Sequence, residues 1–152
     1  MKLAEALQER ADLNARIEQL RERMTQNALV QEGERPAEDP AELMREFDEC
    51  VSRLEVLMNR INLTNCATVT EGKTLTEHIA HRDCLKVRIN AYRRVLNEAS
   101  QPARRAMRSE IKILSTVNVK ETQKKVDEMA KELRLLDNKL QQANWTVELM
   151  DD

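Results

Sequence analysis

The sequence predicts an all-α protein in which four long, heptad-patterned helices form a bundle. Two observations support this prediction. The 152 residues include only two Gly and three Pro, aromatic residues make up 2 %, and charged residues make up 34 %. This composition favours long helices, since Gly and Pro disrupt helix interiors. Apolar residues also recur at alternating spacings of three and four, and the turn signals of a β-sandwich are missing.

Heptad seams define three of the helices, over residues 3–24, 43–61 and 119–143. Capping residues predict where helices begin. Asp39 precedes Pro40, and Asp39, Thr74 and Asn118 are each followed three residues later by Glu, as in a capping box. The rare Gly and Pro residues lie between these segments. We therefore expect one helical-bundle domain over residues 1–152.

The third helix, predicted over about residues 75–99, differs because it has two apolar stripes. The first begins at Leu75 and continues through Leu85 and Ile89. The second consists of Ala80, Cys84, Val87, Ala91 and Val95. Together they cover about half the circumference, whereas a helix on a one-sided core needs a face of about 100°. Such a helix lies centrally in a bundle or at a subunit interface, and we favour the second stripe as the interface of a homo-oligomer.

Two connections, over residues 63–73 and 111–117, are longer than bundle turns require. Both are rich in Thr, Val and Ile, which favour strands. We expect short strands here, which pair with each other as a small β element at one end of the bundle.

Charge is distributed unevenly along the chain. Residues 32–55 contain nine acidic and three basic residues, and residues 82–112 contain nine basic and three acidic residues. The basic segment is typical of a surface for RNA or another anion. Alternatively, the two segments pair with each other within or between subunits. We favour pairing because the sequence pI is about 5.8 and no aromatic residues interleave the arginines.

The only residues of metal-ligating type in close spacing are His78, His81 and Cys84. Residues three apart are neighbours on a helix, so the two histidines could share an ion. We favour a structural role for them, and we expect no metal or other cofactor. No catalytic motif is present, so an enzyme is not expected. Trp145, the only tryptophan, is interpreted as a hydrophobic plug at one end of the bundle.

The sequence gives no sign of a membrane protein. The first residues lack the apolar core of a signal peptide, and no stretch approaches the roughly 18 apolar residues of a membrane span. The three cysteines, Cys50, Cys66 and Cys84, are odd in number and widely spaced. This spacing favours a reducing compartment, and we expect a cytoplasmic protein.

Several segments resemble a family of short bacterial proteins of unknown function that carry the label septicolysin. The matching segments are residues 1–7, 30–40, 60–65, 74–89, 108–119 and 144–145. The resemblance implies a compact helical protein, oligomeric and without an established activity. The label suggests a membrane-active cytolysin, which the residues do not support, since the chain has one Trp, one Tyr and one Phe.

Polar residues flank the expected β element, and we predict that they form a polar network or a ligand site. The candidates are Arg60, Asn62, Asn65, Arg82, Asp83, Arg108, Glu110 and Lys112. As the first choice of function, the sequence favours a non-enzymatic, self-associating scaffold or interaction module. The alternative is an RNA-binding helical hairpin.

Overall fold

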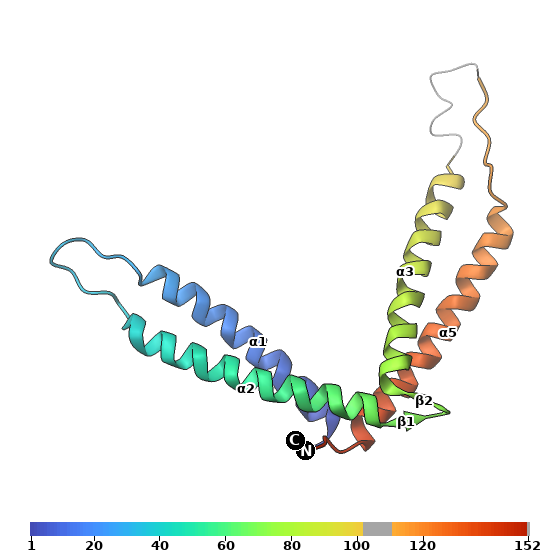
Figure 1. Cartoon of the computed structure of the whole chain (residues 1–152). Helices are drawn as coiled ribbons and strands as arrows, with labels where there is room; N and C mark the ends of the chain where they lie inside the picture. The colour runs from blue at the N-terminus through green and yellow to red at the C-terminus, as the bar shows by residue number, and fades with distance from the viewer. Residues whose placement is uncertain (102–110, 152) are drawn as a thin grey trace. The chain divides into compact units, whose positions relative to one another are not determined.

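The computed structural model describes residues 1–101 and 111–151. These residues form four long helices and one small antiparallel sheet, which confirms the all-α class with a small β element. The helices are α1 (Leu3–Gln26), α2 (Pro40–Ala67), α3 (Leu75–Ala99) and α5 (Val119–Thr146). The strands are β1 (Val69–Thr70) and β2 (Lys73–Thr74) (Figure 1).

The helices begin where the capping residues predict. The Asp39 carboxylate accepts a hydrogen bond from the Ala41 amide at 3.0 Å, and Pro40 occupies the first position of α2. The Asn118 side chain accepts one from the Glu121 amide, also at 3.0 Å, so α5 starts at Val119. Helix α3 begins directly after Thr74. The caps Asp39 and Asn118 each provide a partner for a backbone N–H that has none within its helix.

The described chain divides into two compact units. The first contains residues 1–74 and 143–152, and the second contains residues 75–142. The prediction of a single domain stays a prediction.

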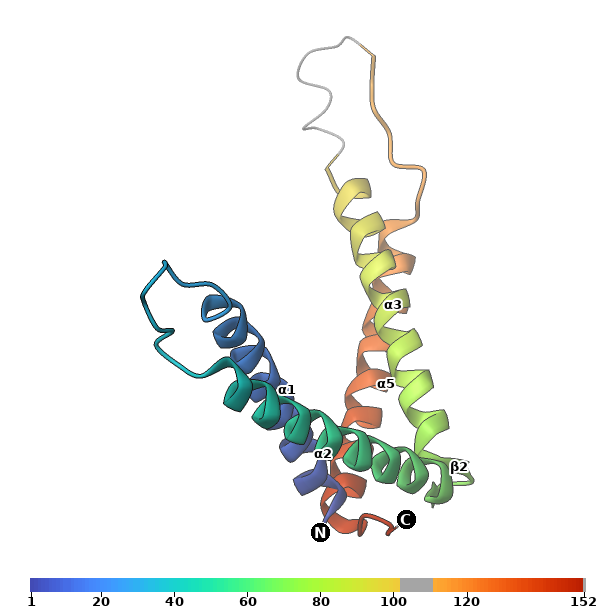
Figure 2. The ribbon, with the colours of Figure 1, turned by 60° about the vertical axis from the view of Figure 1, so that its left-hand side comes forward.

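In the first unit, α1 and α2 lie side by side as an antiparallel pair (Figures 1 and 2). Their heptad seams meet in a core that includes Leu3, Leu20, Leu57 and Ile61, each at most 1 % exposed. The pair is therefore held by the apolar seams that the sequence predicts.

Three arginine–glutamate pairs flank this core at intervals of about seven residues. Arg53 donates to both carboxylate oxygens of Glu9, at 2.6 and 2.9 Å. Arg16 pairs with Glu46, and Arg23 pairs with Glu38 just before α2. The acidic segment 32–55 thus finds part of its counter-charge on α1, and these pairs fix the register of α1 against α2.

The two ends of the described chain join in the first unit. The Leu3 amide donates to the Val147 carbonyl at 2.9 Å, and the Leu149 amide donates to the Met1 carbonyl at 2.8 Å. The fully buried Thr64 hydroxyl accepts from the Met150 amide at 3.0 Å and donates to the Arg60 carbonyl at 2.7 Å. The C-terminal segment is therefore hydrogen-bonded to both α1 and α2.

The β element arises from the first connection alone. Val69 pairs with Thr74 and Thr70 with Lys73, across a two-residue turn at Glu71 and Gly72 with φ of 50° and 78°. Two positive φ values match the type I′ turn, whose twist suits a tight hairpin. The expected pairing with residues 111–117 is wrong, since those residues contain no strand. Because a local hairpin closes only a two-residue loop, it needs no distant partner.

In the second unit, α3 lies beside α5 (Figures 1 and 2). Ile89 and Leu96 of α3 and Val126 of α5 form a buried cluster, against which Met129 and Leu133 pack. Only the first apolar stripe of α3 faces this core. No described helix combines enough length and apolar character to cross a membrane.

Candidate functional site

The second stripe of α3 lies at the surface. Its five residues, Ala80, Cys84, Val87, Ala91 and Val95, are all exposed, and Val87 retains 69 % of its accessible surface. At about 100° per residue, this stripe lies roughly 140° around the helix from the buried stripe. The described part of the chain therefore leaves an apolar helix face uncovered for about four turns.

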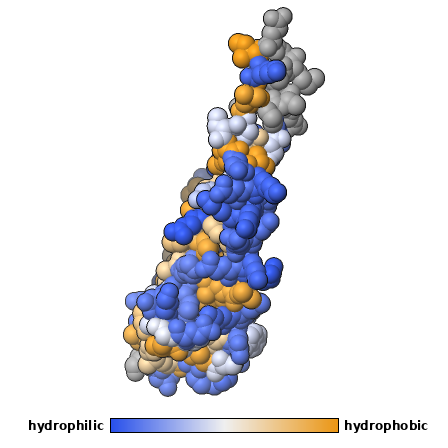
Figure 3. Space-filling model, turned by 90° about the vertical axis from the view of Figure 1, so that its right-hand side faces the viewer, coloured by the Kyte–Doolittle hydropathy of each residue, from blue (hydrophilic) through white to orange (hydrophobic). Residues whose placement is uncertain are grey.

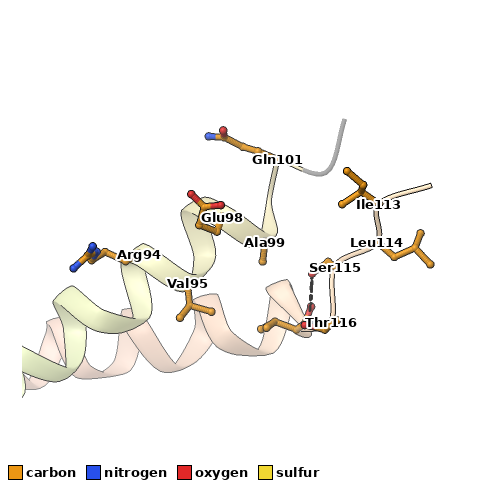
Figure 4. A pocket seen from close by; sticks show the side chains of 10 residues that line it. Arg94, Val95, Glu98, Ala99, Gln101, Ile113, Leu114, Ser115 and Thr116 are labelled. Carbon is orange, nitrogen blue, oxygen red and sulfur yellow. Dashed lines mark hydrogen bonds between the residues drawn. The ribbon is translucent and has the colours of Figure 1, made fainter. Parts of the chain in front are cut away.

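A hollow of about 450 Å³ lies at the end of this face (Figure 4). Val95 and Ala99 of α3 line one side, and Ile113 and Leu114 line the other. Ile113 and Leu114 belong to the segment that leads into α5. In that segment the Ser115 hydroxyl donates to the Val117 carbonyl at 3.0 Å. On the face shown in Figure 3, apolar side chains are visible among hydrophilic ones. The apolar stripe thus continues into an apolar hollow.

The candidate metal ligands point in different directions. His78 lies on the buried side of α3 and is 6 % exposed, whereas Cys84 is exposed. His81 Nε2 lies 2.7 Å from Glu132 Oε1 of α5. Among the described residues, no group of three or more His, Cys, Asp and Glu side chains is arranged to hold a metal ion.

The predicted polar network falls in both units. Arg60 donates to the Met150 carbonyl at 2.8 Å and to Asp151 at 2.5 Å, so it anchors the C-terminal segment of the first unit. Asn62 of the same helix is exposed, and Asn65 is half-buried. These contacts give Arg60 a structural role.

The remaining members of that predicted network belong to the second unit. Arg82 pairs with its neighbour Asp83 at 3.0 Å, and Lys112 is exposed. Arg108 and Glu110 lie outside the described residues. A network that includes all eight residues stays a prediction.

The expected hydrophobic plug at Trp145 is wrong. Trp145 is 64 % exposed and lines a shallow hollow with Ala4, Gln8 and Asp12 of α1. Leu149, three residues beyond α5 and 6 % exposed, is buried instead. The chain therefore buries a smaller aliphatic side chain and leaves the aromatic ring at the surface.

Sequence reasoning missed a contrast between the cations of the two units. Six of the ten basic residues of the first unit form ion pairs with carboxylates; they are Lys2, Arg16, Arg21, Arg23, Arg53 and Arg60. In the second unit, Arg82 pairs with Asp83 and His81 with Glu132, whereas eight exposed cations of the described residues form no ion pair with a described carboxylate. The charge counts indicated a basic segment, but only the structure shows how few of its cations are paired.

Comparisons with known proteins identify relatives without a known role. A family model described as "Family of unknown function (DUF6847)" matches residues 10–149. The chain is similar to a functionally unknown conserved protein from Corynebacterium diphtheriae, known from a crystal structure. The two share 39 % sequence identity and a TM-score of 0.94 over 99 % of each chain. No curated protein matches the sequence.

Proposed function

The chain belongs to this family of unknown function, and we propose that it is a non-enzymatic interaction module of the cytoplasm that self-associates through α3. The observation that carries the proposal is the exposure of the whole second stripe of α3. Burying a Val side chain such as Val87 contributes about 1.5–3 kcal/mol. Nothing in the comparisons supports the septicolysin name or a cytolytic activity.

The spacing of the stripe fits another helix. Ala80, Cys84, Val87 and Ala91 are separated by four, three and four residues, the a/d spacing of a coiled coil. Three of the four are small, so a second helix can approach closely. A second copy of α3 presents the same narrow seam, and a two-fold pair of identical seams forms a closed dimer.

Charges beside the stripe support a second copy in parallel orientation. With Ala80 and Val87 at d positions, Asp83 occupies a g position and Arg88 the following e position. In a parallel pair, a g residue lies opposite the next e residue of the other helix, so Asp83 of each copy lies opposite Arg88 of its partner. Both side chains are exposed, and Arg82 contacts Asp83 through Oδ1, which leaves Oδ2 of the carboxylate for this contact.

The solution mass tests this function. Light scattering is expected to give twice the mass of 17.6 kDa for the protein, and the single-chain mass for Ala91→Glu, which places a charge in the seam. Asn97→Glu is the matched control, since it adds the same charge about 120° around α3 and keeps an acceptor for the Gln101 amide. A single-chain mass for the unmodified protein, or a dimer of Ala91→Glu, contradicts the proposal.

A further inference from the structure

The part of the second unit between residues 86 and 125 carries a concentration of cations, of which the proposed self-association uses only Arg88. Between residues 86 and 125, the described residues include two acidic and eight basic residues. The basic ones are Lys86, Arg88, Arg93, Arg94, Lys112, Lys120, Lys124 and Lys125. All eight are exposed, and none forms an ion pair within the part of the chain that the structure describes.

This excess of positive charge is specific to the second unit. The first unit contains 18 acidic and 10 basic residues, whereas the second contains 9 acidic and 15 basic residues. Because most cations of the first unit are held by carboxylates, they contribute little to the field outside it. The unpaired cations of the second unit make its surface attractive to an external anion.

One flank of α3 orders part of this charge into a row. Lys86, Asn90, Arg93 and Asn97 follow one another at spacings of three and four residues, so they lie along one side of the helix, and Gln101 follows two residues after its end. The helical part of the row, from Lys86 to Asn97, spans about 16 Å at 1.5 Å per residue, and the row contains no carboxylate. The Gln101 amide donates to the Asn97 side chain at 3.1 Å, and Arg94 lies next to the row.

We infer that this row binds the phosphodiester backbone of a nucleic acid. Lys, Arg, Asn and Gln side chains all donate hydrogen bonds to phosphate and sugar oxygens, which supply most protein–nucleic acid contacts. The row contains no apolar side chain, whereas the core of a protein–protein interface is apolar and depleted in charge. Contacts of this kind position a backbone and do not read sequence.

Binding is tested by fluorescence anisotropy of the full-length protein with labelled duplexes of about 20 base pairs, one of RNA and one of DNA of the same sequence. The variant Lys86→Gln/Arg93→Gln/Arg94→Gln is expected to bind at least about tenfold more weakly. Its slope of log affinity against log salt is expected to fall by about two to three, one for each lost phosphate contact. A stronger effect on one duplex identifies the preferred nucleic acid.

The matched control removes three cations from the first unit, as Arg35→Gln/Arg45→Gln/Lys73→Gln. All three residues are exposed, so net charge changes equally while the row stays intact, and binding is expected to match that of the unmodified protein. Equal losses for both variants would show a general charge effect and overturn the proposal, as would no binding of either duplex at low salt. Binding of anionic phospholipid vesicles in place of the duplexes, or loss of the dimer in the row variant, would assign the row to another partner.

Discussion

Thr64 shows how much a single buried polar group contributes to the stability of the first unit. Its hydroxyl is completely buried, donates to the Arg60 carbonyl and accepts from the Met150 amide at 3.0 Å. Val has nearly the same shape but offers no acceptor, so Thr64→Val leaves the Met150 amide without a partner. We expect a loss of about 1–3 kcal/mol of unfolding free energy, measured by urea denaturation.

Thr25→Val is the control for this prediction. The Thr25 hydroxyl also donates to a carbonyl four residues earlier, that of Arg21, at 2.9 Å, but Thr25 is exposed. Its replacement is expected to change stability by less than about 0.5 kcal/mol. Equal effects at both positions would show that the bond to Met150 contributes nothing.

Glu38 gives the first unit a dependence on pH. The hydrogen bond from Arg23 holds the pKa of the Glu38 carboxyl below its ordinary value. A lowered pKa in the folded state contributes stability above the unfolded pKa of about 4.3, and this stability is lost as pH falls through the folded pKa. We therefore expect Glu38→Gln to lower the urea midpoint at pH 7 and to make progressively less difference as the pH falls below the unfolded pKa and through the lowered folded pKa.

Glu34→Gln separates the effect of the ion pair on stability from the effect of removing a negative charge. Glu34 is exposed and forms no ion pair among the described residues, so its replacement removes one negative charge and no bridge. The difference between this variant and the unmodified protein is expected to stay small at every pH. If Glu34→Gln follows the same profile as Glu38→Gln, general charge repulsion explains the effect.

At the scale of the elements, the orientation of the proposed dimer makes Cys84 a reporter. In a parallel pair of α3 helices, Cys84 occupies an a position and faces Cys84 of the second copy, close enough for a disulfide. Mild oxidation is expected to give a covalent dimer on non-reducing gels. In an antiparallel pair the two thiols lie apart, and this dimer does not form.

Cys66 provides the comparison for the crosslinking experiment. Both cysteines are exposed, but Cys66 belongs to α2 of the first unit, whereas Cys84 belongs to the stripe of the second unit. Cys84→Ser is expected to abolish the covalent dimer, and Cys66→Ser is expected to leave it unchanged. A dimer that disappears with Cys66→Ser would place the contact on the first unit.

The elements show which features a sequence can predict. The starts of α2, α3 and α5 follow from Asp39, Thr74 and Asn118, because capping is local chemistry. The end of α2 does not follow from the sequence. Thr64 and Asn65 have low intrinsic helix propensity, yet the helix continues to Ala67. Burial of Ile61 and Thr64 within the first unit overrides that propensity, and burial depends on tertiary structure.

The candidate surfaces were predictable to different degrees. The two stripes of α3 are visible in the sequence, but only the structure shows that α5 covers one of them and leaves the other exposed. The seven-residue spacing of Glu9, Arg16 and Arg23 was also visible, yet their partners depend on the register of α1 against α2. Cations without partners are likewise identified only once the paired ones are known.

At the scale of the whole molecule, the two proposed surfaces respond oppositely to salt. Association through the stripe buries apolar side chains, and added salt does not weaken apolar burial. Binding through the row neutralises phosphates and releases counterions, so affinity falls steeply with salt. Between about 50 mM and about 200 mM NaCl, we expect the mass from light scattering to stay that of a dimer while nucleic-acid affinity falls by at least about tenfold.

The same pair of measurements on the row variant shows whether the surfaces are independent. Lys86→Gln/Arg93→Gln/Arg94→Gln keeps all five stripe residues, so the dimer is expected at both salt concentrations while the salt dependence of binding flattens. A dimer that dissociates with salt would mean that the bridges between Asp83 and Arg88, and not the apolar seam, hold the copies together. In that case the charged flanks of α3 determine assembly, and Arg88→Gln is the variant that is expected to abolish it.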